Sequence, residues 1–248
     1  MKNQYDICFA LCAHGRADLL EMVLTNLQIK LKNTNLNSGI LVVCSPDDEC
    51  FDVALDHEVH IHSMENVTLG WRFNEMLMQA AKLGRYVVHI GSDDFLSIEY
   101  LEFLSKVAKH ENIMAGGLDR AMFIDIESLE CREVLEYGST WMGGGKFIHC
   151  SVINKMNGDI YPDHLSRGVD RPAQNKIEKF LISQRQSFIQ VKQLSTPGLI
   201  ALKDGENIHG INAFRNFPER EYQYIYLDAP DREMINLMHA QRKEGSND

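Results

Sequence analysis

The stretch Tyr86-Val87-Val88-His89-Ile90-Gly91-Ser92-Asp93-Asp94 decides the predicted fold, because a short apolar run ends in two adjacent carboxylates. A run of this kind is typical of a buried strand. In an open α/β sheet, ligands bind at the carboxyl ends of the strands, so both acids are expected at that edge. Neighbouring carboxylates suit a magnesium or manganese ion. The alternative interpretation is an acidic N-cap for a helix that follows directly.

Strands and helices are predicted to alternate on both sides of this stretch. Apolar runs indicate strands at 7–13, 40–44 and 59–62. Apolar residues at helical spacing indicate the intervening helices, one of which carries Phe73, Met76, Leu77 and Ala80 on one face. This alternation predicts an α/β fold with a mainly parallel central sheet flanked by helices on both faces.

The second half of the chain has a less regular pattern. We expect a hairpin at 122–126 and 131–135, a helix at 170–183, short strands at 188–191 and 199–203, and a final helix after Pro230 with Met234, Leu237 and Met238 on its apolar face. No repeat or linker divides the chain. The sequence therefore predicts one domain with a regular front half and a smaller, irregular back half.

The composition limits the classes of function. The 248 residues include 35 Asp and Glu against 25 Lys and Arg, a net charge of −10, which argues against broad electrostatic capture of nucleic acid. The six cysteines form no CxxC pair, so a metal site built from thiolates is not expected. We expect the protein to be located in a reducing cytoplasm. Neither a signal peptide nor a membrane-spanning run is expected.

A further block of residues stands in a fixed order ahead of the two acids. It comprises Asn66, Gly70, Arg72 and Asn74, then Gly84-Arg85-Tyr86, and then Ser92-Asp93-Asp94. With this block, the chain resembles the family 2 glycosyltransferases of the GT-A fold over residues 5–215. The family usually has an Asp where Gly91 stands, so this chain lacks the first acid of the family's Asp-x-Asp motif.

The resemblance implies a GT-A enzyme that moves a sugar from a nucleotide-diphosphate donor to a hydroxyl acceptor. It implies a single domain at 1–228, with a nucleotide-sugar-binding half at 1–115 and an acceptor-binding half at 116–228. A C-terminal helix and a disordered tail would occupy 229–248. A Mn²⁺ or Mg²⁺ ion would stabilise the charge on the leaving diphosphate. The implied metal ligands are Asp93 and His209.

The implied donor-binding residues lie in the loops after the strands and in the block above. They are Ala13, Arg16, Asp47, Arg72, Asn74, Ser92, Asp94 and Lys203. Among them, Ala13, Arg16 and Asp47 would hold the nucleoside, and Arg72 and Lys203 would help to neutralise the diphosphate. For Asp47 the alternative is a turn former, and for Arg16 a solvated residue at a helix start.

Asp170 is the implied general base of an inverting reaction, because a carboxylate near the acceptor can take the proton of the attacking hydroxyl. The family often has a Glu where Val169 stands. The alternative for Asp170 is an N-cap, with Pro172 early in the helix that follows. Asp159 and Asp163 are further candidates for the base.

The implied acceptor-binding residues belong to the segment around Gly143-Gly144-Gly145. Gly144 and Gly145 would let a sugar approach the backbone closely. Trp141 would stack on a sugar face or pack in the core. Trp71 is expected to pack or to form a pocket wall.

Other functions remain open besides transfer to a saccharide. Transfer to a modified base in DNA is not favoured by the net charge, and a Lys/Arg groove beside Asp170 would support it. A nucleotidyltransferase would need a basic, glycine-rich phosphate loop after the first strand, and Ala13-His14-Gly15-Arg16 is a poor version of one. Gly91 and Val169 suggest a third alternative, a sugar-nucleotide-binding protein without catalysis.

Overall fold

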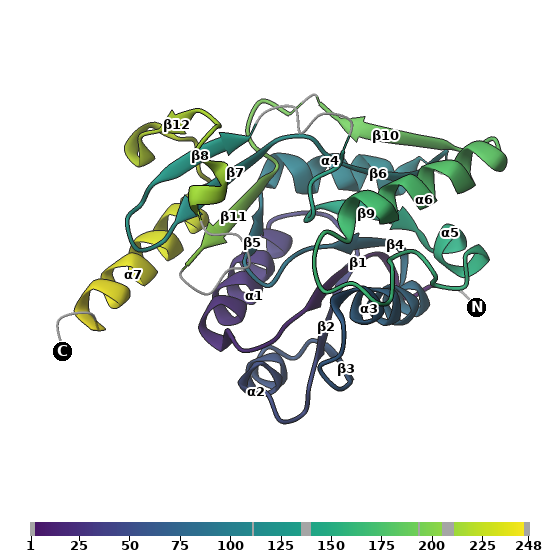
Figure 1. The fold of residues 1–248 in the computed structure, drawn as a ribbon, viewed down its shortest axis with the longest axis horizontal. Helices are drawn as coiled ribbons and strands as arrows, with labels where there is room; N and C mark the ends of the chain where they lie inside the picture. The colour runs from purple at the N-terminus through teal and green to yellow at the C-terminus, as the bar shows by residue number, and fades with distance from the viewer. Residues whose placement is uncertain (1–2, 111, 135–139, 193, 205–210, 246–248) are drawn as a thin grey trace.

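The computed structural model describes residues 3–110, 112–134, 140–192, 194–204 and 211–245. Its strands form two sheets (Figure 1). The first has the order β10 (Ser187–Val191), β6 (Ile113–Leu118), β9 (Lys146–His149), β4 (Gly84–His89), β1 (Tyr5–Cys12), β2 (Ser38–Cys44) and β3 (His60–Ser63). The second has the order β12 (Glu219–Arg220), β8 (Cys131–Val134), β7 (Ala121–Asp125), β11 (Leu199–Lys203) and β5 (Asp94–Leu96).

The helices pack around the two sheets. They are α1 (Ala17–Lys32), α2 (Glu49–Asp56), α3 (Leu69–Leu83), α4 (Ile98–Lys109), α5 (Cys150–Lys155), α6 (Asp170–Ser183) and α7 (Ala229–Gly245), with short 3₁₀ turns at η1 (Ile211–Phe214) and η2 (Tyr222–Tyr224). All neighbours in the first sheet are parallel except β9, which is antiparallel to both β4 and β6. The predicted α/β architecture with a mainly parallel sheet is thus confirmed.

The central strand β1 separates two hydrophobic cores. Its alternate residues Ile7, Phe9 and Leu11 pack with α1 and α4, while Cys8 and Ala10 pack with α3 and α5. Successive side chains of a strand point to opposite faces. Because residues 7–12 of β1 are all apolar, the strand needs apolar helices on both sides, which is what the predicted helices at 19–27 and 73–80 supply.

The two acids lie where the chain crosses from one sheet to the other. Strand β4 ends at His89 in the first sheet, and β5 begins at Asp94 in the second. The alternative that the acids cap the helix that follows is wrong, because β5 lies between them and α4 and pairs with β11. The cap of α4 is Ser97, whose Oγ accepts a hydrogen bond from the Tyr100 N–H at 3.2 Å. The two acids are therefore not a helix cap.

The back half contains both confirmed and missed elements. The predicted hairpin exists as β7 and β8, and the helix predicted at 170–183 is α6. Strands β6 and β9 were not predicted. The glycine loop at 143–145 leads into β9, and α5 follows that strand. All six cysteines are free.

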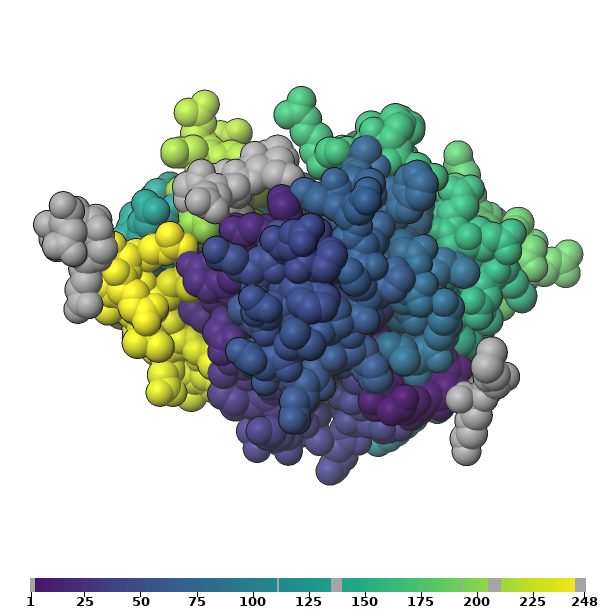
Figure 2. Space-filling model, turned by 90° about the horizontal axis from the view of Figure 1, so that it is seen from below, coloured from purple at the N-terminus to yellow at the C-terminus, as the bar shows by residue number. Residues whose placement is uncertain are grey.

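The C-terminal helix α7 packs against α1 from the opposite end of the chain (Figure 2, yellow against purple). Ile235 and Met238 are buried, whereas Leu237, expected on the apolar face, is 59% exposed. The buried ammonium of Lys30 on α1 donates to Asp231 Oδ1 at 2.5 Å and to the Leu96 carbonyl at 2.7 Å. Helix α7 is therefore anchored to the strand that follows the two acids.

No helix in the described part of the chain is long and apolar enough to span a bilayer.

Candidate active site

A cavity of about 760 Å³ opens between the two sheets and the amino end of α6. Its wall includes the two acids after β4, the glycine loop before β9 and the first residues of α6. Three of the predicted site residues, Asp93, Asp170 and Lys203, line it together although they are far apart in the sequence. Of the remaining predicted residues, Asp94, Trp141 and Gly144 also line it.

Asp93 faces two cations at one wall of this cavity. Its Oδ2 lies 3.3 Å from Nη1 of Arg16 and 3.5 Å from Nζ of Lys203. Lys203 arrives there because its neighbour on β11, Leu202, donates its N–H to the Asp93 carbonyl at 2.8 Å. Arg16 also reaches the Ser92 hydroxyl at 3.5 Å. The predicted donor-binding residues Arg16, Ser92 and Lys203 are thus gathered around Asp93.

Asp94 is buried and hydrogen-bonds the neighbouring backbone. Its Oδ2 accepts a hydrogen bond from the Gly91 N–H at 2.9 Å. Burial raises the pKa of Asp94 to about 7, and the adjacent charge of Asp93 adds to the rise. Asp94 therefore fixes the loop between the sheets, and Asp93 is the acid that pairs with Arg16 and Lys203.

Gly91 and Gly144 are glycines because the Asp94 carboxylate occupies the space beside them. A Cβ on Gly91 would lie 2.7 Å from Asp94 Oδ2 and 2.8 Å from Asp93 Oδ1. A Cβ on Gly144 would also overlap Asp94 Oδ2. The missing first acid of the Asp-x-Asp pattern is thus matched by the local packing, because a side chain at position 91 would require the carboxylates of Asp93 and Asp94 to shift.

Asp170 stands on the opposite side of the glycine loop. It is the first residue of α6 and makes no cap, so the alternative of an N-cap is wrong. Its Oδ1 accepts a hydrogen bond from Nζ of the buried Lys146. Burial alone would raise the pKa of Asp170, but the charge of Lys146 outweighs it and holds this pKa below its ordinary value. Asp170 is therefore an ionised carboxylate at neutral pH. Lys146, the first residue of β9, was not predicted to take part.

Hydrogen bonds from helix α3 hold the loop after β1 in place. The buried guanidinium of Arg72 donates to the Ala13 carbonyl at 2.6 Å and to the Asn66 side chain at 2.9 Å. Asn74 holds the segment before α6, because its side chain bonds the backbone of Tyr161 and Ile160. Neither Arg72 nor Asn74 lines the cavity. The predicted block therefore joins the loop after β1 to the segment that leads to Asp170.

Asp48, rather than the predicted Asp47, contacts the loop after β1. Asp47 is exposed in the turn after β2. Asp48 caps α2 through the Cys50 N–H, accepts from the Gly15 N–H at 3.0 Å and lies 2.5 Å from His14 Nδ1. Burial would raise the pKa of Asp48, but the hydrogen bonds lower it. The signal for Asp48 was available, since an Asp before an acidic first turn is a favoured N-cap.

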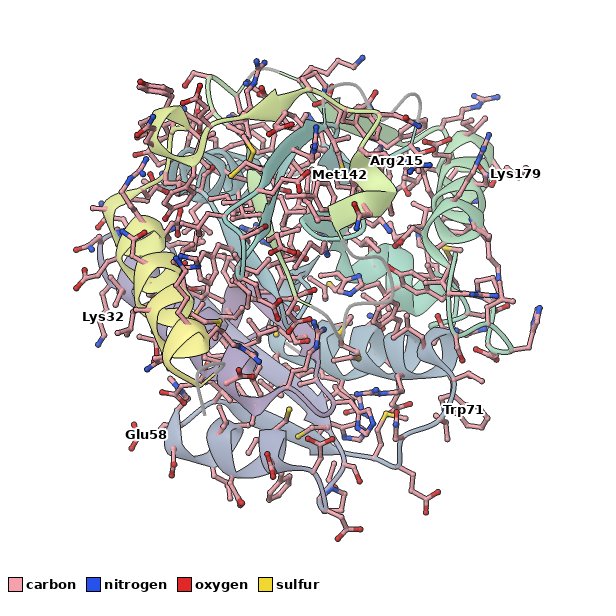
Figure 3. All side chains as sticks on the ribbon, turned by 60° about the vertical axis from the view of Figure 1, so that its left-hand side comes forward. Lys32, Glu58, Trp71, Met142, Lys179 and Arg215 are labelled. Carbon is pink, nitrogen blue, oxygen red and sulfur yellow. The ribbon has the colours of Figure 1, made fainter. Side chains whose placement is uncertain are left out.

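The remaining predicted residues differ in their exposure. Trp141 is buried, and its backbone N–H donates to the Gln174 side chain at 2.7 Å. Gly145 donates its N–H to the His89 carbonyl at 2.8 Å. Trp71, expected to pack or to line a pocket, is instead 55% exposed and points away from the protein (Figure 3). The predicted metal ligand His209 lies outside the described residues.

Two basic residues missed by the sequence analysis lie on either side of Asp170 in the chain. Arg167 and Arg171 are exposed and line the cavity. They place positive charge beside the candidate base in a protein with a net charge of −10.

The described residues supply part, but not all, of the coordination of a divalent ion. None of their His, Cys, Asp and Glu side chains form a group of three that could hold a metal. An Mg²⁺ or Mn²⁺ ion at a nucleotide needs only one or two carboxylates, since the substrate phosphates supply further ligands. Asp93 supplies one such carboxylate on the cavity wall. The residues present therefore fit an ion that is bound together with the donor.

Comparison with known proteins gives a fold and no sequence family. No protein-family model matches the sequence, and no curated protein matches it. Among solved structures, the mannosyltransferase PcManGT from Pyrobaculum calidifontis, in complex with GDP-Man and Mn²⁺, matches with a TM-score of 0.56 and 13% identity. That match covers 86% of this chain and 61% of the mannosyltransferase.

Two further matches come from other sources. S. aureus TarS 1–349 in complex with UDP matches with a TM-score of 0.57 and 14% identity over 79% of this chain and 60% of TarS 1–349. The catalytic domain of Drosophila β1,4-galactosyltransferase 7, in complex with xylobiose, matches with a TM-score of 0.53 and 10% identity over 93% of this chain and 79% of that domain. The predicted GT-A fold is therefore confirmed, and the chain spans about three fifths of the length of the first two proteins.

Proposed function

We propose that this protein is an inverting glycosyltransferase that moves a sugar from a nucleotide-diphosphate donor to a hydroxyl acceptor. The observation that carries the proposal is that Asp93, Lys203 and Asp170 line one cavity, with Arg16 3.3 Å from Asp93. The fold around this cavity is shared with solved glycosyltransferases. One wall then suits a diphosphate, and the other suits the hydroxyl that attacks the sugar.

The donor's diphosphate would lie against Arg16 and Lys203. These side chains supply positive charge at the point where negative charge grows as the bond from the sugar C1 to the phosphate oxygen breaks. A Mn²⁺ or Mg²⁺ ion between Asp93 and the diphosphate would stabilise that charge as a Lewis acid. Ser92 positions Arg16, while Arg72 and Ala13 hold the loop that faces the nucleoside.

Nucleoside contacts are assigned to the loops after β1 and β2. Asp47 stays the candidate for the base because it is exposed in the turn after β2. Asp48 fixes this turn against Gly15 and is assigned a supporting role. Asn74 and Asp94 are likewise assigned to positioning, since their polar atoms bond the neighbouring backbone.

On the acceptor side, Asp170 would take the proton of the attacking hydroxyl while the new bond to C1 forms. The electron pair of the broken bond leaves with the diphosphate, so attack from the opposite face inverts the anomeric carbon. A positioned base of this kind contributes about 10²–10⁴-fold to the rate. The acceptor would lie along Gly144 and Gly145, with Trp141 as a buried wall of the site.

A thermal-shift screen tests donor binding. UDP, GDP, ADP and CDP are each added with Mn²⁺ or with EDTA, and the same is done for the variant Asp93→Ala. We expect one nucleotide to raise the Tm with Mn²⁺, because a ligand that binds only the folded state stabilises it. Failure of every nucleotide to stabilise the protein would reject the proposal.

DNA is a second candidate acceptor, and Arg167 and Arg171 are the observation that favours it. Arginine suits phosphate because its planar fork donates two parallel hydrogen bonds. Transfer to hydroxymethylated DNA is measured against transfer to oligosaccharides, and the variant Arg167→Ala/Arg171→Ala serves as the control. Affinity for DNA that falls steeply with salt, and falls further in this variant, would favour DNA. If neither salt nor the double variant changes the affinity for DNA, a saccharide is the favoured acceptor.

A further inference from the structure

Lys146 is a buried lysine whose ammonium group forms an ion pair with the candidate base, Asp170. Its side chain is 1% exposed, and its Nζ donates to Asp170 Oδ1. The same Nζ lies 5.6 Å from the centroid of the Tyr161 ring. Lysine is almost never fully buried unless it is paired. The ion pair with Asp170 therefore compensates the burial of Lys146.

The two oxygens of Asp170 have different surroundings. Oδ1 is held by Lys146. Oδ2 faces the glycine loop, because a Cβ on Gly143 would lie 3.2 Å from it. Gly143 and Asp170 both line the cavity. Lys146 thus holds one oxygen and leaves the other beside Gly143, at the cavity wall.

Two aromatic rings and several charged side chains also surround Asp170 or line the same cavity. His89 faces Lys146 from β4, and burial together with the Lys146 charge lowers the pKa of His89 to about 3. His89 Nδ1 lies 3.0 Å from the Tyr161 hydroxyl, whose pKa burial raises. Both rings are therefore neutral at pH 7. Asp93, Asp94 and Lys203 line the same cavity, and Arg167 and Arg171 flank Asp170 on its own segment.

We propose that Lys146 is a positioning residue that keeps Asp170 ionised and determines which of its oxygens receives the acceptor proton. This inference rests on the proposed function, in which Asp170 is the general base. A buried carboxyl without a partner would hold its proton at higher pH and could then not accept another. An adjacent cation lowers the pKa of a carboxylate by about 1–3 units, which keeps it ready at neutral pH.

Three substitutions separate charge from hydrogen bonding at this position. Lys146→Met removes both, Lys146→Gln keeps a donor without charge, and Lys146→Arg keeps the charge. The measurement is kcat/KM from pH 4 to 9. We expect the acid limb of the profile to move up by about 1–3 pH units in the Met and Gln variants and to stay in place in the Arg variant. Rates that fall by one factor at all pH values in the Met and Gln variants would show a merely structural role and overturn the proposal.

A readout without turnover separates this inference from the proposed function. The Asp170 carboxyl is titrated by ¹³C NMR in the wild-type protein and in both uncharged variants, and Asp170→Asn assigns the signal. We expect the pKa of Asp170 to rise in the Met and Gln variants. A rise in this pKa without any glycosyl transfer would support the role of Lys146 while the proposed function fails. An unchanged pKa would overturn the role of Lys146, whatever the activity.

Discussion

Replacing Gly91 by Asp restores the first acid of the Asp-x-Asp pattern in the sequence, but we predict that it weakens donor binding. The reason is steric. The new Cβ would lie 2.7 Å from Asp94 Oδ2 and 2.8 Å from Asp93 Oδ1, closer than such atoms approach without a shift. Asp94 is 8% exposed and bonded to the Gly91 N–H at 2.9 Å, so its carboxylate cannot move without losing that bond.

The size of the effect follows from these contacts. Overpacking of a filled site costs about 1–3 kcal/mol. Displacement of Asp93 also takes its Oδ2 away from Arg16 and Lys203, which lie at 3.3 and 3.5 Å. We therefore expect Gly91→Asp to lower the free energy of unfolding by about 1–3 kcal/mol. The Kd of the nucleoside diphosphate with Mn²⁺ should rise about tenfold, equivalent to 1.4 kcal/mol.

The assays are urea unfolding at pH 7 and calorimetric titration with the nucleoside diphosphate identified by the thermal-shift screen. Gly91→Ala is the matched control, because it introduces the same Cβ without a carboxylate. The steric explanation predicts that both variants lose stability and affinity. Tighter Mn²⁺-dependent binding in Gly91→Asp than in the wild-type protein, with stability unchanged, would refute the reasoning.

Three further substitutions test other parts of the account. Asp93→Ala should abolish the Mn²⁺-dependent part of nucleoside diphosphate affinity in calorimetry, and an unchanged affinity would reject its metal role. Asp170→Asn should spare donor binding and stop transfer, and normal turnover would reject Asp170 as the base. The same variant should cost about 1–3 kcal/mol in urea unfolding at pH 7, less than a fully buried pair because Asp170 is 39% exposed. The pKa of Asp170 is lowered in the folded state, so this difference should shrink as the pH falls below about 4, and a constant difference would contradict it. Lys30→Met should cost about 3–5 kcal/mol, because it leaves the fully buried Asp231 without its cation, and Lys30→Met/Asp231→Leu should recover most of the loss.

The regular half of the fold was predictable because its signals are local. Strand β1 is a continuous apolar run, helix α3 carries apolar residues at helical spacing, and the run from Tyr86 to Ile90 ends in charge. The direction of β4 then determines where Asp93 lies, since a strand end is a sheet edge. The ordered block before it predicted the GT-A fold, which the comparison with solved structures confirmed.

The missed parts depend on contacts between distant segments. Strand β6 contains Gly116 and Gly117, and β9 has four residues, so neither shows a strand pattern of its own. The pairing of β9 with β4 is what buries Lys146 beneath Asp170. In the sequence, Lys146 is only a cation after three glycines. Its partner lies 24 residues further along the chain, and no periodicity connects the two.

The most direct test of the central account is the configuration of the sugar that leaves the donor. The wild-type protein is incubated with an α-linked nucleotide-diphosphate sugar, Mn²⁺ and an acceptor, and the product linkage is determined by ¹H NMR. Asp170 as the base in the cavity that it shares with Asp93 predicts a β-linked product and release of the nucleoside diphosphate. An α-linked product would contradict the account, as would the absence of release with every donor that binds.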